Sequence, residues 1–261
     1  MRSISRFNVT PVKGMGLHHP DEVMLGVAGI PESRRFFLVD GYGEMFSSWA
    51  FGALVRIRAE YDSASEQLTL DLGTGAVVKD ETKDLGQGMV VNFYGRPVAA
   101  HEVLGPFADA ISAFVGRPMR LMRCDRDGDA VDVHPLTIVS TASVRDLAAR
   151  GKHGTELDSR RFRINIEFEG EEPYEEDGWD GGLVRVGDAV LRIAGQIPRC
   201  VVTTQSPETG EKDWNTLTQI AKYRPRIGGD GGLPFGMYAL VEEVGIARVG
   251  DEVVPIPLPV P

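Results

Sequence analysis

The chain has 261 residues, 42% of them hydrophobic and 25% charged, a composition typical of a globular protein with one large or two modest domains. Its 28 basic and 38 acidic residues give a formal net charge of −10, which argues against a nucleic-acid partner or an anionic membrane surface, because both need a positive field. Two cysteines exclude a disulfide framework and an all-cysteine metal or iron–sulfur site, and the start of the chain has no apolar run, so we expect a cytoplasmic protein without a signal peptide or membrane span.

Short apolar runs between evenly spread glycines and prolines predict a mainly β protein with a few helices. Residues 34–40, followed by a Gly-Tyr-Gly turn, are predicted to form a strand. Residues 55–61 and 68–72 alternate apolar and polar side chains, so we expect a hairpin connected by the polar residues 62–67. Three later segments carry apolar stripes at helical spacing and are predicted to be helices: 106–116, 141–151 and 213–223.

The Arg117-Pro118 step is taken as the boundary between a β-rich N-terminal domain, residues 1–118, and a second domain, residues 119–261. Acidic residues are concentrated in 167–177, and this segment is expected to be a solvated loop. The closing proline-rich residues 255–261 are expected to form an extended tail.

Cys200 is the most informative position for function. It adjoins Arg199, and a thiol beside a fixed positive charge is biased toward thiolate, the form that attacks electrophiles and binds metals. The alternative is a small buried residue at the start of a strand, because free cysteine is among the most buried residue types. No histidine in the sequence has a context that marks it as the base of a cysteine nucleophile, and the sequence has no P-loop or GxSxG motif.

Several basic residues are placed where together they could bind an anion. Lys13 lies in a glycine-containing loop whose backbone N–H groups can approach an anion closely. Arg161 and Arg163 alternate with apolar residues, so we expect them on one face of a strand. With Arg35 and Arg199 they could line a phosphate or pterin site, while each alone is explained by a surface charge or a salt bridge.

Taken in order, motifs along nearly the whole chain resemble the MOSC family, named after the C-terminal domain of molybdenum cofactor sulfurase. The similarity is greatest to the subgroup in which a MOSC N-terminal β-barrel precedes the MOSC domain, as in the mitochondrial amidoxime reducing components. The most specific motifs are RFRIN at 161–165 and RCVVTT at 199–204 followed by PETG at 207–210. Supporting motifs are PVKG at 11–14, RFFLV at 35–39, PLTIVSTAS at 135–143, EEDGW at 175–179 and FGMY at 235–238.

The resemblance implies a β-barrel MOSC domain after a β-rich N-terminal domain, with the site in the cleft between them. It also implies the molybdenum–molybdopterin cofactor, with Cys200 as the catalytic residue and molybdenum ligand. The positions that match the family's cofactor-binding residues are Lys13, Gly14, Arg35, His134, Arg163, Asn165, Arg199 and Tyr238. The chain departs from the family where His134 replaces a small hydroxyl residue, and where Gly14 and Pro198 replace a serine and a small polar residue.

The activity implied by the resemblance is the reduction of small N-hydroxylated compounds, of the amidoxime or hydroxylamine type. Thiolate is a soft ligand suited to molybdenum, and the redox chemistry belongs to the cofactor. Electrons would come from a separate electron-transfer protein, because two cysteines cannot hold a [2Fe–2S] cluster. The alternatives are a carrier of the cofactor or of a Cys200 persulfide without redox turnover, and a degenerate β-barrel with an empty site. Nucleic acid, membrane and pyridoxal phosphate are not expected to bind.

Overall fold

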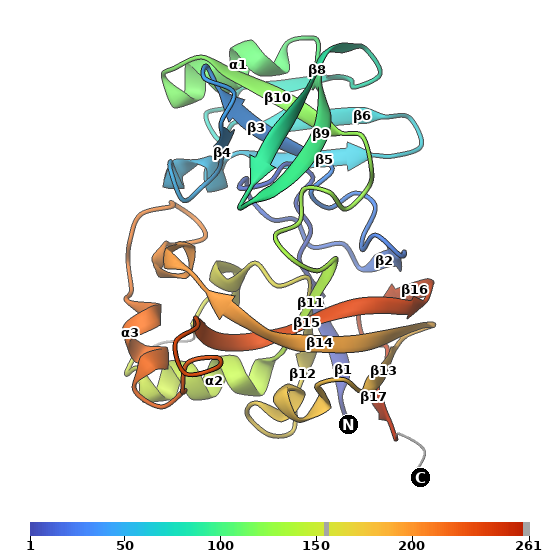
Figure 1. The fold of residues 1–261 in the computed structure, drawn as a ribbon, viewed down its shortest axis with the longest axis vertical. Helices are drawn as coiled ribbons and strands as arrows, with labels where there is room; N and C mark the ends of the chain where they lie inside the picture. The colour runs from blue at the N-terminus through green and yellow to red at the C-terminus, as the bar shows by residue number, and fades with distance from the viewer. Residues whose placement is uncertain (154–156, 258–261) are drawn as a thin grey trace.

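Short strands separated by tight turns make up most of the chain. The computed structural model describes residues 1–153 and 157–257 (Figure 1). Its strands gather into two β-rich parts, one above the other in the figure, which are called here the upper part and the lower part. The prediction of a mainly β protein with a few helices is confirmed.

The lower part is built on a sheet that nearly closes into a barrel. Within the described residues the sheet has seven strands, in the order β1 (Ser3–Phe7), β12 (Ile166–Glu169), β11 (Leu136–Ser140), β15 (Leu233–Glu243), β14 (Ala189–Arg199), β13 (Leu183–Val186) and β17 (Val253–Ile256). The edge strands meet where Ser3 and Glu252 form an antiparallel bridge and the Val253 N–H donates to the Arg2 carbonyl at 3.0 Å. Buried apolar side chains fill the interior, among them Phe168.

Helices and turns flank this barrel: α2 (Thr141–Arg150), α3 (Thr216–Ala221), and the 3-10 turns η2 (Ser159–Phe162), η3 (Glu175–Trp179) and η4 (Val201–Thr204). The predicted helix 141–151 is confirmed, and its N-cap is Ser140, whose Oγ accepts the Ser143 N–H at 3.0 Å. The predicted helix 213–223 is shorter than expected, because the Asn215 side chain accepts the Thr218 N–H and caps the helix there. In the described part of the chain, no helix is long and apolar enough to span a bilayer.

The upper part contains two further sheets. One has the order β4 (Met45–Phe46), β3 (Phe36–Asp40), β10 (Met119–Cys124), β9 (Arg96–Val103) and β8 (Leu85–Phe93). The other has the order β5 (Arg58–Asp62), β6 (Gln67–Asp71) and β7 (Val77–Glu81), and α1 (Phe107–Val115) packs against β10 of the first sheet. The predicted strand at 34–40, the helix after Pro106 and the β5–β6 hairpin are confirmed. The strand expected from residue 55 begins only at Arg58, because η1 (Gly52–Arg56) precedes it.

The strand pairings bear on the predicted boundary after residue 118. β10 is hydrogen-bonded between β3 and β9, so residues 119–124 lie in the sheet of the upper part. β1 pairs with β12, so residues 3–7 lie in the sheet of the lower part, with β2 (Glu22–Leu25) and β16 (Gly245–Arg248) paired beside it. The division into domains stays a prediction, and these pairings favour a boundary after Cys124.

The acidic segment is not a uniformly solvated loop, and for two of its residues that prediction is wrong. Glu167 is buried because its carboxylate accepts hydrogen bonds from Arg6, Asn8 and Ser159. Glu176 is completely buried where its carboxylate faces the start of α2. Part of the predicted tail is strand β17, paired with β13, and residues 258–261 lie outside the described residues.

Candidate functional site

The RFRIN motif forms a turn, and the prediction that Arg161 and Arg163 share a strand face is wrong. The Asp158 carboxylate accepts the Arg160 N–H and starts η2, and Arg163 then adopts a left-handed backbone conformation with a φ of 52°. The two arginines therefore point to different partners. Arg161 pairs with Asp213 at 3.1 Å, whereas Arg163 Nη2 donates to the Met15 carbonyl at 2.7 Å.

Arg163 is a desolvated cation. Within the described residues no carboxylate lies within ion-pair distance of its guanidinium, and burial lowers its pKa to about 10. The motif's Asn165 holds the turn to the barrel, because its N–H donates to Thr137 Oγ1 at 2.9 Å and its Oδ1 accepts the same hydroxyl at 3.0 Å. Asn165 thus positions Arg163 beneath the Met15 loop.

Lys13 reaches the same region from the upper part. Its backbone N–H donates to the Phe36 carbonyl, and its Nζ donates to the Ala130 carbonyl at 2.9 Å and to Asp132 Oδ1 at 2.6 Å. Burial lowers the pKa of Lys13 to about 8, although Asp132 opposes this shift. Desolvation would raise the pKa of Asp132, but the charges of Lys13 and Arg34 lower it to about 2.

Gly14 allows this loop to pack closely. Its φ of +88° is in the left-handed region, and a Cβ at this position would overlap Ser47 Oγ and lie 2.9 Å from the Ser48 backbone nitrogen. The glycine is therefore required for the contact with residues 47–48, which places Lys13 at the base of the upper part.

The structure places Cys200 at the surface, just after β14. Its thiol is exposed, whereas Cys124 is the buried one of the two free cysteines, so the alternative of Cys200 as a buried residue at a strand start is wrong. The Cys200 carbonyl accepts both the N–H and the Oγ1–H of Thr203, which holds the RCVVTT turn.

Arg199, the residue before Cys200, is held in place by one hydrogen bond and has a second N–H donor without a partner among the described residues. Its Nε donates to the Phe235 carbonyl at 2.9 Å, and its guanidinium lies 5.5 Å from the Phe162 ring centroid. Its Nη2 is buried and has no hydrogen-bond partner among the residues that the structure describes. Burial lowers the pKa of Arg199 to about 10, against the charges of Tyr238 and Cys200. A buried donor of this kind marks a place for an external acceptor.

Tyr238 and His134 close one side of the site. Their rings meet edge to face with centroids 5.1 Å apart, on the paired strand β15 and just before β11. Burial raises the pKa of Tyr238, and the charges of Asp132 and Cys200 add to this shift. Figure 1 shows that these elements lie where the lower part faces the upper part.

The cations interact with one another electrostatically across the two parts. Arg34 and Asp132 act on Lys13, Arg163 and Arg199, and the same two groups act on Tyr238. Four cations around one carboxylate make this region positive in a chain with a net charge of −10. Such a site suits a phosphate or another compact anion.

Arg35, one of the predicted site residues, has its hydrogen bond and ion pair outside the cation cluster. Its Nη1 donates to the Cys124 carbonyl at 2.9 Å and pairs with Asp127 at 2.6 Å. The neighbouring Arg34 occupies the cluster instead, with a left-handed φ of 55° that turns it away from β3. Sequence reasoning missed Arg34 and Asp132. The sequence points to Arg34 only through its position next to Arg35.

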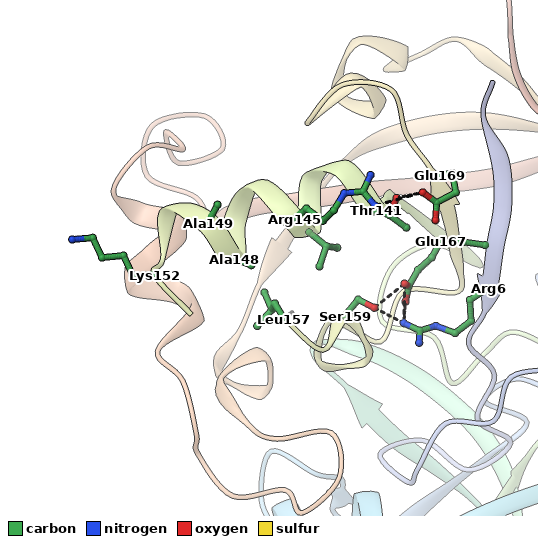
Figure 2. A pocket seen from close by; sticks show the side chains of 12 residues that line it. Arg6, Thr141, Arg145, Ala148, Ala149, Lys152, Leu157, Ser159, Glu167 and Glu169 are labelled. Atoms are coloured by element: carbon green, nitrogen blue, oxygen red, sulfur yellow. Dashed lines mark hydrogen bonds and ion pairs between the residues drawn. The ribbon is translucent and has the colours of Figure 1, made fainter. Parts of the chain in front are cut away.

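Two cavities lie apart from the Cys200 thiol. One of about 260 Å³ lies between the parts and is lined by four arginines, among them Arg163, and by two acidic residues. The larger, of about 660 Å³, lies beside α2, where Figure 2 shows Arg6, Ser159 and Glu167 joined by hydrogen bonds. No predicted site residue lines the larger cavity, so the cation cluster remains the candidate site.

Cys200 cannot build a metal centre with neighbouring side chains of this chain. Among residues 1–153 and 157–257, no group of three or more His, Cys, Asp or Glu side chains could hold a metal ion. A metal on Cys200 therefore needs further ligands from a bound molecule. The cations beside it fit a molecule that also carries an anionic group.

The low pKa of Lys13 predicts a pH dependence of stability in the cofactor-free protein. Below pH 8 the lysine is charged in both states, and its burial destabilises the fold. Above pH 8 the folded state loses this proton, while the unfolded chain keeps it up to the ordinary lysine pKa of 10.5, so the free energy of unfolding rises with pH. We expect the free energy of unfolding, relative to Lys13→Met, to rise by about 2 kcal/mol from pH 8 to 10. Urea titrations of both proteins at each pH measure it, and a constant difference would contradict the prediction.

Comparison with known proteins gives independent evidence on the family of this chain. Residues 125–254 match the MOSC domain family model. The chain is 38% identical to mitochondrial amidoxime reducing component 2 of Rattus norvegicus over 128 residues, 47% of this chain and 37% of that protein. It is 33% identical to mitochondrial amidoxime-reducing component 1 of Homo sapiens over 147 residues, 52% of this chain and 42% of that protein. Molybdenum cofactor sulfurase of Oryza sativa subsp. japonica is 27% identical over 246 residues, 78% of this chain and 28% of that protein. The chain thus spans less than half the length of these relatives.

Proposed function

We infer from the MOSC domain at residues 125–254, which makes this chain a member of the MOSC family, that it binds the molybdenum cofactor and reduces small N-hydroxylated compounds. The observation that carries the proposal is the exposed Cys200 thiol beside Arg199, whose buried Nη2 lacks a partner within the described residues. The names of the amidoxime reducing components support the reaction class.

The residues of the cation cluster fit the cofactor. Cys200 would supply the protein ligand to molybdenum, and the bound pterin would supply further sulfur ligands. Arg199 Nη2, together with Arg163 and Lys13, would neutralise the anionic groups of the pterin. When bound, the cofactor supplies two-electron redox chemistry at a centre that can accept oxygen.

The chain's own residues hold the reacting groups in place. The edge-to-face contact of Tyr238 with His134 forms one wall, and the hydrogen bonds of Thr203 hold Cys200 at the mouth of the site. In the overall reaction the N–O bond breaks, two electrons and two protons are taken up, and water is released. We propose that a separate electron-transfer protein provides the electrons. A cytoplasmic location stays a prediction.

The proposal is tested by anaerobic reduction of benzamidoxime with reduced methyl viologen as the artificial donor. The protein is expressed in a cofactor-sufficient host, and its molybdenum content is measured first. We expect benzamidine to form at a rate proportional to the molybdenum content, with no turnover by Cys200→Ala. A fully loaded protein that produces no benzamidine would overturn the reductase proposal.

The exposure of Cys200 also favours a second function, a carrier of a persulfide or of the cofactor without redox turnover. An exposed thiol can be reached by a separate acceptor protein, and the Arg199 guanidinium interacts electrostatically with Cys200. Intact-mass analysis separates the two functions. One extra labile sulfur atom on Cys200, in a protein that retains no molybdenum, would overturn the reductase proposal in favour of the carrier function.

A further inference from the structure

An aromatic residue of the upper part lies at the tip of the β8–β9 hairpin. Phe93 pairs with Arg96, so Tyr94 and Gly95 alone form the turn, and both have a left-handed φ, of 52° and 93°. This is the geometry of a type I′ turn, in which the first position is normally Asn, Asp or Gly. A tyrosine there is strained in its backbone, which points to a use for the side chain.

The hairpin is held firmly against the site. Phe93 is buried, with its ring 4.8 Å from Phe37 and 5.5 Å from Lys13 Nζ. Arg96 Nη2 donates to the carbonyls of Asp129 and Val131 at 2.7 and 2.8 Å, on the segment that leads to Asp132. Figure 1 shows the β8–β9 tip directed toward the lower part. The position of Tyr94 is therefore set by its neighbours on both sides.

Tyr94 lies within electrostatic range of the site. It is 67% exposed, yet its phenol interacts with the charges of Asp132, Cys200 and Arg34. Partial burial and the first two of these charges raise the pKa of Tyr94 to about 12, so its ring stays neutral at physiological pH.

Two exposed valines lie next to the same charged groups. Val133, 58% exposed, follows Asp132, and Val201, 43% exposed, follows Cys200. These two residues and Tyr94 are exposed apolar side chains, whereas the interior of the site is charged. A ligand that fits both regions is apolar and flat at one end and polar at the other.

We propose that Tyr94 is a specificity-determining residue, whose ring packs against the aromatic end of the substrate while the N-hydroxylated end reaches Cys200. The substrate class is therefore planar aromatic N-hydroxylated compounds rather than aliphatic ones. The N-hydroxylated end rests on the proposed function, whereas the aromatic end rests on the exposed Tyr94 ring and on the anchoring of its hairpin beside the site. Contact of the ring with a substrate explains why a tyrosine occupies a turn position that disfavours it.

The role of Tyr94 can be tested without cofactor, because Cys200 is the exposed thiol and burial raises the pKa of the Cys124 thiol to about 12. The cofactor-free protein is alkylated with N-phenylmaleimide and with N-ethylmaleimide, and the two rate constants are followed by intact mass. Cys200→Ala gives the background. We expect the phenyl-to-ethyl rate ratio to fall about threefold to tenfold in Tyr94→Asn, the range expected for loss of one aromatic contact.

Matched variants separate the ring from the backbone. Tyr94→Asn is expected to fold, because asparagine tolerates a left-handed φ and Asn-Gly favours the type I′ turn. Tyr94→Phe keeps the ring and should keep the wild-type ratio. Tyr42→Asn removes a tyrosine that is 94% exposed in the turn between β3 and β4, and it should also keep the ratio. An unchanged ratio in Tyr94→Asn would overturn the proposal.

The molybdenum-loaded protein provides the second readout. In Tyr94→Asn we expect KM for benzamidoxime to rise about threefold to tenfold with kcat unchanged, and KM for acetamidoxime to stay constant. An equal change for both substrates would contradict the specificity role. If the loaded wild-type protein reduced neither substrate, the proposed function would fail, and the alkylation ratio would still decide whether Tyr94 recognises an aromatic group.

Discussion

Cys200→Ala is expected to remove molybdenum from a protein that otherwise holds close to one atom per chain. The thiolate is the only ligand that we assign to the chain, so its loss leaves molybdenum held by the pterin alone. The fold should be preserved, because the side chain is exposed and η4 is held through the Cys200 carbonyl, which alanine retains. Elemental analysis of protein from a cofactor-sufficient host measures the effect.

Cys124→Ala is the matched control for this experiment. Cys124 also has an arginine neighbour in sequence, but it is buried in the upper part, packed with Phe37, Met45 and other apolar side chains. We expect full molybdenum content and a loss of about 1 kcal/mol in the free energy of unfolding, from the small cavity. Equal loss of molybdenum from both variants would show that Cys200 is not the specific ligand.

Gly210→Ala is expected to destabilise the protein by about 3 kcal/mol or more. Gly210 is the glycine of the PETG motif, and it has a φ of +77°. A Cβ there would overlap the carbonyl group of Gly52 at the start of η1, and a Cβ at Gly52 would overlap Gly210 in return. The two backbones therefore touch where the upper part meets the segment after Cys200, and Gln205 Nε2 donates to the Ser48 carbonyl beside them. The cost combines a strained backbone with displacement of this contact.

Gly75→Ala is the matched control, because Gly75 has a similar φ of +86° and no described atom lies within 4 Å of the added Cβ. It isolates the backbone cost, for which we expect about 1 kcal/mol. Urea denaturation of both variants gives the free energies of unfolding. Equal losses would show that the Gly52–Gly210 contact adds nothing to the stability.

Local features of the sequence predicted the elements well. The helix at 141–151 was predicted from its apolar stripe, and the structure adds the Ser140 cap, which acts within one turn. The β5–β6 hairpin was predicted from alternation across a short polar link. Arg161 and Arg163 show where such patterns fail. An alternation of polar and apolar residues over only three positions predicts a strand, but here these residues lie in and just after the short turn that Asp158 caps.

The composition of the site was less accessible to sequence reasoning. Of the two consecutive arginines at 34 and 35, the motif match selected Arg35, while the structure brings Arg34 to Asp132. Glu176 reads as one more charge in an acidic run, yet it is buried against Ser140 and Ser143. Both outcomes depend on partners far away in the chain.

The sequence by itself determined the mainly β character, the helices, the family resemblance and the distinction of Cys200 from Cys124. These properties are carried by composition, by spacing within a few residues and by short motifs. Only the tertiary structure decided that Lys13, Arg34, Asp132, Arg163 and Arg199 share one electrostatic environment, and that Tyr94 interacts with the charges of Asp132 and Cys200. The reason is physical: desolvation and charge–charge interactions depend on distance in space, and barrel closure and the β8–β9 hairpin bring together segments far apart in the chain.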